Sequence, residues 1–130
     1  MVWTGWELDR IILLLVGLAE LLLFGQVTMF HYRQNFHHTA MWLPIIGTPL
    51  IGIAAILLAL INTPALVGLV KVLFWIGLVA GLIGFYYHFR GVGKRVDGYV
   101  TRNFLVGPPV ILPLMISVLA VVGLFGLYWR

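Results

Sequence analysis

Four long apolar segments divide the chain, and short polar segments separate them. Their approximate ranges are residues 11–30, 43–61, 66–87 and 110–129. Each is close to the length of about 20 residues that an α-helix needs to cross the hydrocarbon core of a bilayer. Because backbone groups in lipid must satisfy their hydrogen bonds within the segment, each one is predicted to be a helix. The pattern therefore predicts an all-α integral membrane protein, with four transmembrane helices in one domain covering residues 1–130.

Composition narrows the choice of function classes. Apolar side chains make up 62% of the residues and charged ones only 9%, which excludes a soluble enzyme domain. Four spans leave no room for a catalytic domain outside the membrane. The chain has no cysteine, which excludes disulfides, thiolate metal sites, covalently attached haem and iron–sulfur clusters. The absence of cysteine does not exclude haem b, which is bound noncovalently.

The segments between the spans predict a topology. Asn62-Thr63-Pro64-Ala65 is typical of a tight turn, so the second and third helices are expected to be antiparallel neighbours. Residues 31–42 and 88–109 form longer polar links on one side of the membrane. By the positive-inside rule these two links are cytoplasmic, and both termini lie outside the inner (plasma) membrane of a multi-pass protein. The basic residues of the links are Arg33, Arg90, Lys94, Arg95 and Arg102, against Arg10, Arg130 and the nearby Lys71 on the other side.

Aromatic residues mark the two expected membrane interfaces. Those at the outer interface are Trp3, Trp6 and Trp129, and those at the cytoplasmic interface are Tyr32, Trp42, Tyr86 and Tyr87.

A short motif occurs twice. Phe30-His31-Tyr32-Arg33 ends the first apolar segment and Tyr87-His88-Phe89-Arg90 ends the third, and an Asn-Phe pair follows each. This predicts a tandem duplication of a two-helix unit, with the two copies inserted in the same orientation. His31 and His88 would then lie at one depth.

These motifs allow two interpretations of the histidines and arginines. A pair of imidazoles at one depth suits bis-histidine ligation of haem b, with Arg33 and Arg90 holding propionates, a quinone or a lipid headgroup. Alternatively, His and Arg are there because a membrane interface selects them.

A shared metal ion is a further alternative for the histidines. His31 and His38 are seven residues apart with His37 adjacent, but supporting carboxylates are missing apart from Asp97. Neither a metal site nor a catalytic residue is predicted.

Glu20 is the one carboxylate inside an apolar segment, near its midpoint. An ionised acid at that depth costs several kcal/mol unless it faces protein, water or a partner. Helical spacing places Glu20, Phe24, Val27 and His31 on one face, with Glu20 and His31 about 16 Å apart. Glu20 is therefore either a proton-titrating or substrate-binding group, or a protonated acid that bonds to a polar neighbour. The candidate neighbours are Gln26, Thr48, Ser117, a carbonyl group and the small-residue face at Gly77-x-x-x-Gly81.

Four short spans with a carboxylate midway along the first resemble, in outline, the small multidrug resistance transporters. The resemblance covers this architecture and Glu20, and it implies a small proton-coupled transporter in which Glu20 binds a proton or a cationic drug. The longer basic link before the fourth span and the two aromatic-His-aromatic-Arg motifs depart from that family. The family's Tyr- and Trp-bearing substrate motifs have no counterpart in the second and third spans.

The function that the sequence favours is that of a non-enzymatic subunit, which anchors or stabilises a larger membrane complex such as an electron-transfer one. Its expected partners are membrane lipids and other membrane subunits, and the basic link is too small for nucleic acid. The chain's 15 glycines offer more close-packing surface than a four-helix bundle need use.

Overall fold

The computed structural model describes residues 2–129, and every regular element in that range is a helix. Within it, four helical segments are long and apolar enough to cross a membrane, which confirms the predicted fold class at that level. They are α1, α2 together with the 3-10 turn before it, α3 and α5. Arg130, which entered the charge comparison above, lies outside the described residues. The elements are α1 (Leu8–Arg33), η1 (Thr39–Met41), α2 (Trp42–Ile61), α3 (Pro64–Arg95), α4 (Thr101–Val106) and α5 (Ile111–Tyr128).

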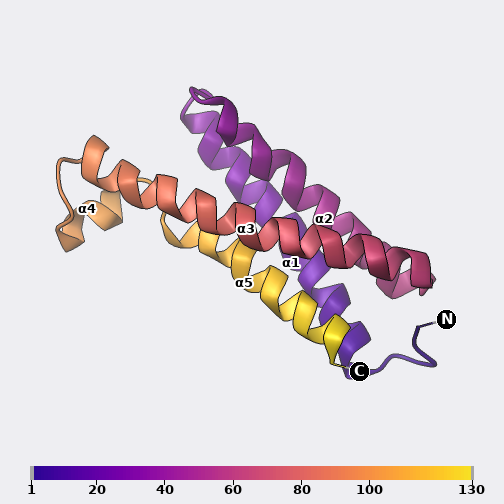
Figure 1. Ribbon diagram of the computed structural model, residues 1–130. Coiled ribbons are helices and arrows are strands. Elements are labelled where there is room, and N and C mark those ends of the chain that lie inside the picture. Colours follow the sequence, from indigo (N-terminus) through magenta and orange to yellow (C-terminus); the bar gives the residue numbers. More distant parts are fainter. Residues whose placement is uncertain (1, 130) are drawn as a thin grey trace.

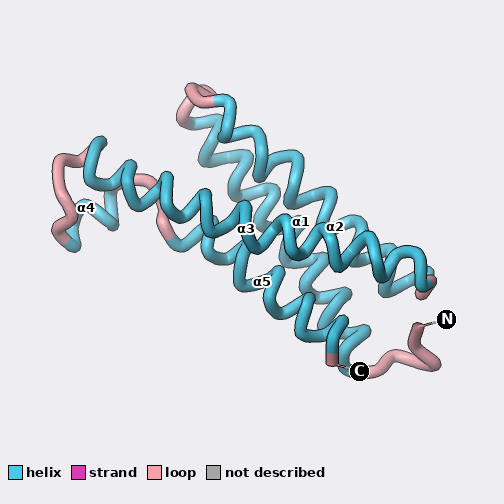
Figure 2. Tube along the Cα trace, viewed as in Figure 1, coloured by secondary structure: helices cyan, strands magenta, loops and turns pink. Residues whose placement is uncertain are grey.

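The four long helices form a closed ring. Contacts between elements are most extensive between α1 and α2 and between α3 and α5, and they continue between α1 and α5 and between α2 and α3. Helices α1 and α3 are therefore diagonal to each other. Figure 1 shows that the α1–α2 pair and the α3–α5 pair diverge toward the end that carries α4. Figure 2 places the longer loops at that same end and the N-terminal segment at the opposite one.

The turn between α2 and α3 forms as predicted. Asn62 ends α2 in the left-handed conformation, with φ of 59°, and its N–H donates to the carbonyl of Leu58. Left-handed Asn is a common residue just after a helix, and Pro64 opens α3 where its missing N–H costs nothing. The contact between α2 and α3 confirms that these helices are neighbours.

Helix α3 extends beyond the predicted span. It continues to Arg95 rather than ending near residue 87, and its 32 residues give a length of about 48 Å. This exceeds the hydrocarbon thickness of about 30 Å. The polar residues within 88–95 end the apolar segment, which is why the span was predicted to stop near residue 87. The helix itself continues, because residues 88–95 contain no proline. His88 and Arg90 are thus helical residues, and the link begins only at Val96.

Two close approaches of backbone hold the helix pairs together. A Cβ at Gly17 of α1 would lie 2.9 Å from the carbonyl oxygen of Gly52 on α2. A Cβ at Gly81 of α3 would lie 2.7 Å from the carbonyl oxygen of Pro113 on α5. Beside the second contact, the Ser117 hydroxyl donates to the carbonyl of Leu78 across 2.8 Å. Each pair therefore packs at a point where only glycine leaves room.

The N-terminal segment is tied to the end of the bundle opposite α4. The Asn62 side-chain oxygen accepts from the N–H groups of Val2 and Trp3 at 2.7 and 2.9 Å. Its amide nitrogen donates to the Trp3 carbonyl at 2.6 Å. Trp3 is only 2% exposed, whereas the sequence predicts an interfacial ring. Arg10 adds a bond from Nε to the carbonyl of Ala59, at 2.7 Å.

Candidate functional site

Glu20 lies on the inner face of α1. Its exposed fraction is 0%, and the predicted face is confirmed because Val27 and His31 are buried on it and Phe24 is half-buried. On α2 its neighbour is Gly52, where a Cβ would lie 3.1 Å from the Cβ of Glu20. Both carboxylate oxygens are buried without a hydrogen-bond partner in the described structure. A polar group in this condition calls for an explanation beyond packing.

The hydrogen-bonding neighbours considered for Glu20 are engaged elsewhere. Thr48 donates to the carbonyl of Pro44 at 2.6 Å, and Ser117 bonds to Leu78. The small-residue face at Gly77 and Gly81 packs against Ile51, Ala120 and residues of α5. Glu20 bonds to none of these candidate neighbours in the described structure, because neither of its carboxylate oxygens has a hydrogen-bond partner there.

Gln26 also fails as a partner for Glu20, because it lies on the outer face of α1. Six residues correspond to a rotation of about 600°, so Gln26 is about 120° around the helix from Glu20. The same spacing argument, applied to the sequence, would have identified it as an outward-facing amide.

The repeated motifs bring His31 and His88 to the same end of the bundle. His31 is buried in the last turn of α1, and its Nδ1 has no hydrogen-bond partner among the described residues. His88 is half-buried on α3, and its Nδ1 lies 2.7 Å from the carbonyl oxygen of Pro109.

One ring has the local geometry that a haem ligand needs. The fixed Nδ1 of His88 is typical of a ligating imidazole, which leaves Nε2 available. Neither ring lines the hollow between the ends of α1 and α3. Bis-histidine haem ligation stays a prediction. Among residues 2–129, no three side chains of the metal-ligating types come together, so the shared metal ion is not supported.

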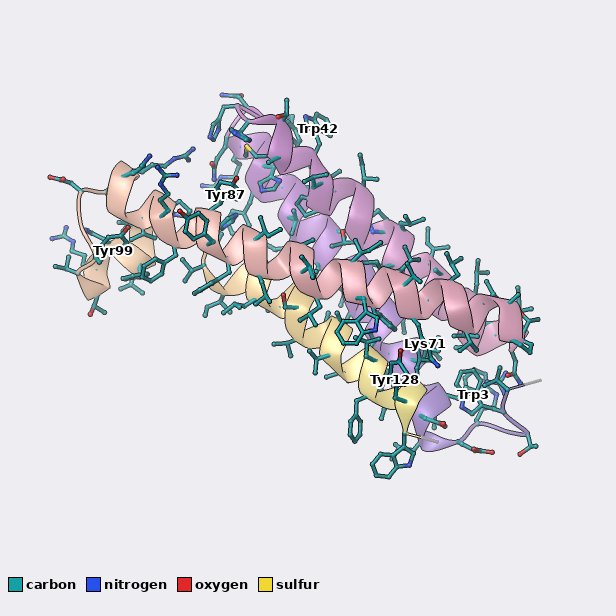
Figure 3. All side chains as sticks on the ribbon, in the orientation of Figure 1. Trp3, Trp42, Lys71, Tyr87, Tyr99 and Tyr128 are labelled. Atoms are coloured by element: carbon teal, nitrogen blue, oxygen red, sulfur yellow. The ribbon has the colours of Figure 1, made fainter. Side chains whose placement is uncertain are left out.

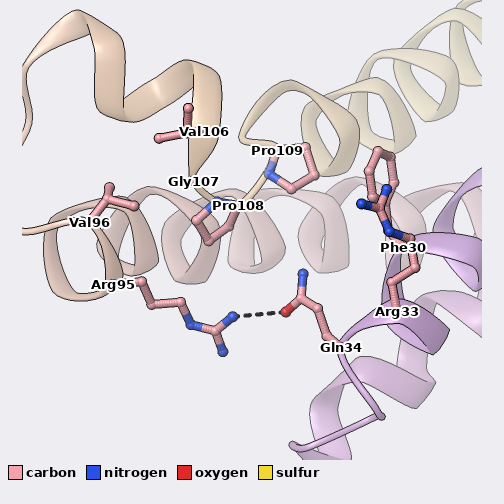
Figure 4. Close-up of a pocket in the computed structure, with 9 residues that line it drawn as sticks. All are labelled: Phe30, Arg33, Gln34, Arg95, Val96, Val106, Gly107, Pro108 and Pro109. Carbon is pink, nitrogen blue, oxygen red and sulfur yellow. Dashed lines mark hydrogen bonds between the residues drawn. The ribbon is translucent and has the colours of Figure 1, made fainter.

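The structure pairs Arg33 with Arg95 rather than with Arg90. Arg33 and Arg95 both line a hollow of about 300 Å³ between the ends of α1 and α3 and the link from α4 to α5 (Figure 4). Arg90 is exposed and does not line it. Arg95 donates to Oε1 of Gln34 at 2.8 Å and also contacts His37. The complete lining is Phe30, Arg33, Gln34, Arg95, Val96, Val106, Gly107, Pro108 and Pro109.

Aromatic side chains mark both ends of the bundle. Figure 3 shows Trp42, Tyr87 and Tyr99 toward the end with the longer loops, and Trp3, Lys71 and Tyr128 toward the other. The Lys71 ammonium lies 4.3 Å from the centre of the Tyr128 ring, an arrangement that suits a lysine near the interface. The Phe89 and Tyr99 rings stack, and Phe104 of α4 packs against both in tilted contacts that hold α4 against the end of α3.

An outward-facing stripe on α1 was not anticipated. It consists of Leu18, Leu22, Gly25, Gln26 and Met29, all of them exposed, and is called the Gln26 face below. The structure gives Gln26 no hydrogen bond within the described residues, and a Cβ at Gly25 would meet nothing within 4 Å.

Comparison with protein-family models, with curated proteins and with solved structures found no match for this chain.

Proposed function

We propose that this protein is a non-enzymatic, multi-pass subunit of the inner membrane, which anchors or stabilises a larger membrane complex through the Gln26 face. The observation that carries the proposal is the Gln26 side chain, which is exposed on α1 and has no hydrogen bond within residues 2–129. It lies beside Gly25, where a Cβ would meet nothing within 4 Å.

The depth of Gln26 makes this surface unsuited to lipid alone. Gln26 precedes Tyr32, an interfacial residue, by six positions, which places it about 9 Å deeper along the helix. Hydrocarbon offers no hydrogen-bond partner at that depth. A helix from a partner protein would supply one, and the open backbone at Gly25 lets that helix approach closely. An interhelical hydrogen bond of this kind contributes about 0.6–2 kcal/mol.

Site-specific photocrosslinking tests the proposal. A photoreactive residue at Leu22, on the Gln26 face, is expected to crosslink one defined membrane protein in intact membranes. The same group at Val79, exposed on α3, is the control and is expected to label lipid only. Gln26→Leu and Gly25→Leu should abolish the Leu22 adduct because they remove the amide and the space.

Gly68→Leu is the matched control substitution, since Gly68 is an equally open glycine on α3. It should leave the adduct intact. Equal labelling from Leu22 and Val79, or a protein that purifies in mild detergent only as a monomer or homodimer, would contradict the proposal.

The buried carboxylate supports a second candidate function, that of a small proton-coupled transporter. Within the part of the chain that the structure describes, neither oxygen of Glu20 has a hydrogen-bond partner, and the side chain is fully buried. A proton or a cation is the natural counterpart of its charge there. The observation is independent of the Gln26 face, because the two residues lie on different faces of α1.

A growth assay with tetraphenylphosphonium tests the transporter. Expression of the wild-type chain is expected to confer resistance, and Glu20→Gln is expected to abolish it. Glu7→Gln, a change to an acid outside the span, is the control and should keep the resistance. Resistance that survives Glu20→Gln, or that never develops, argues against this function.

A further inference from the structure

We infer that the hollow between the ends of α1 and α3 binds a phosphate-bearing anion, held by Arg33 and Arg95. Both arginines line the same space, although they are 62 positions apart in the sequence.

The two arginines retain most of their donors. A guanidinium has five N–H groups. Arg95 uses some of its own on Gln34 and His37, while Arg33 makes no hydrogen bond within the described residues. The contacts of Arg95 fix its plane, so its remaining donors are pre-oriented. The free donors of both side chains can form the paired bonds that a planar fork makes with phosphate oxygens.

No acid lines the hollow beside these two arginines. None of the residues lining the hollow is Asp or Glu, and Asp97 is the single acid between residues 31 and 110. Two cations facing one space repel each other, and an anion between them removes that cost. Arg33 and Arg95 are the C-terminal residues of α1 and α3. Because the C-terminal end of a helix carries partial negative charge, the helix ends do not attract an anion, and the arginine side chains must hold it.

The remaining walls favour a lipid phosphate over a free one. Phe30, Val96, Val106, Pro108 and Pro109 supply apolar surface beside the two cations. Such walls suit the glycerol and upper acyl carbons that accompany a lipid phosphate. The hollow lies between the ends of α1 and α3. Figure 3 shows Trp42, Tyr87 and Tyr99 toward that same end of the bundle, and lipid headgroups are found beside such interfacial rings.

Native mass spectrometry of the detergent-purified protein tests this inference with three added probes. The probes are dioleoylphosphatidylglycerol, dioleoylphosphatidylcholine and inorganic phosphate. We expect one tightly held phosphatidylglycerol per chain, whose apparent affinity falls about tenfold or more in Arg33→Gln, since bonds to charged groups contribute about 1.5–3 kcal/mol. Displacement of the lipid by millimolar inorganic phosphate would identify a free phosphate as the ligand, and resistance to displacement would identify the lipid.

Matched variants distinguish binding in the hollow from a general attraction of anions to the basic end of the bundle. Arg102→Gln removes the same charge from the same end but outside the hollow, and is expected to change the affinity less than twofold. Arg33→Lys keeps the positive charge but loses the planar pair of guanidinium donors, so it should bind phosphatidylglycerol more weakly than the wild type. The inference is overturned if Arg102→Gln weakens binding as much as Arg33→Gln, or if neither anion binds with a defined stoichiometry. Circular dichroism confirms that each variant retains its helices.

Discussion

At the scale of single residues, Asn62 does more than end a helix. Its backbone takes the left-handed conformation that turns the chain into α3, while its side chain makes three bonds to the N-terminal segment. One residue therefore fixes two segments that are far apart in the sequence. The sequence predicts the turn, but not the second role, because no local pattern links Asn62 to Trp3.

Two substitutions separate these roles. Asn62→Gly keeps the left-handed backbone and loses the side-chain bonds, so we expect a loss of about 2–3 kcal/mol in the free energy of unfolding. Asn62→Ala adds the strain of a side chain at positive φ and should cost about 1 kcal/mol more. Unfolding titrations in mixed micelles measure both. Equal stability of Asn62→Gly and the wild type would show that the N-terminal bonds contribute nothing.

At the scale of elements, the helices follow from apolar length, but their ends do not. The first, second and fourth spans begin and end within a few residues of the predicted limits. Helix α3 continues for eight residues past its predicted end, and the short helix α4 was not predicted at all. Ring contacts among Phe89, Tyr99 and Phe104 hold α4 against the end of α3, and such tertiary contacts leave no local pattern in the sequence. For the same reason the sequence could not identify Arg95, rather than Arg90, as the neighbour of Arg33. Whether the two halves are copies stays a prediction.

Helix α3 offers a paired test of close packing. Gly81→Ala would place a Cβ 2.7 Å from the Pro113 carbonyl oxygen and 2.8 Å from the Ser117 backbone nitrogen, which backbone atoms cannot easily avoid. We expect it to destabilise the α3–α5 contact by about 1–3 kcal/mol. Gly68→Ala, in open space on the same helix, should be neutral or stabilising by up to about 1 kcal/mol. The measurement is the free energy of unfolding of each variant. Equal values for Gly81→Ala and Gly68→Ala would contradict the close packing of α3 against α5 at Gly81.

At the scale of the whole molecule, the bundle has unlike ends. One end is closed by the short turn at Asn62 and the docked N-terminal segment. The other diverges and carries Arg33, Arg90, Lys94, Arg95 and Arg102. The positions of the basic residues along the chain predict this charge asymmetry, whereas no sequence pattern indicates that the two helix pairs diverge.

The orientation of this asymmetric bundle can be tested with single cysteines, since the chain has none of its own. Thr4→Cys and Thr101→Cys each place a thiol at an exposed position, at opposite ends. By the positive-inside rule, an impermeant maleimide is expected to label Thr4→Cys in intact cells and Thr101→Cys only after permeabilisation. The reverse pattern would show that the basic end faces outward.

The bonds from Asn62 to the N-terminal segment also bear on biogenesis. Trp3 leaves the ribosome 59 residues before its partner, a delay of about 3–12 s at about 5–20 residues per second. During that interval the first segment and the first helical hairpin must enter the bilayer without this restraint. Residues 2 and 3 can therefore bond to Asn62 only after the α1–α2 hairpin is complete. Once formed, these bonds would oppose movement of the N-terminus to the other side of the membrane.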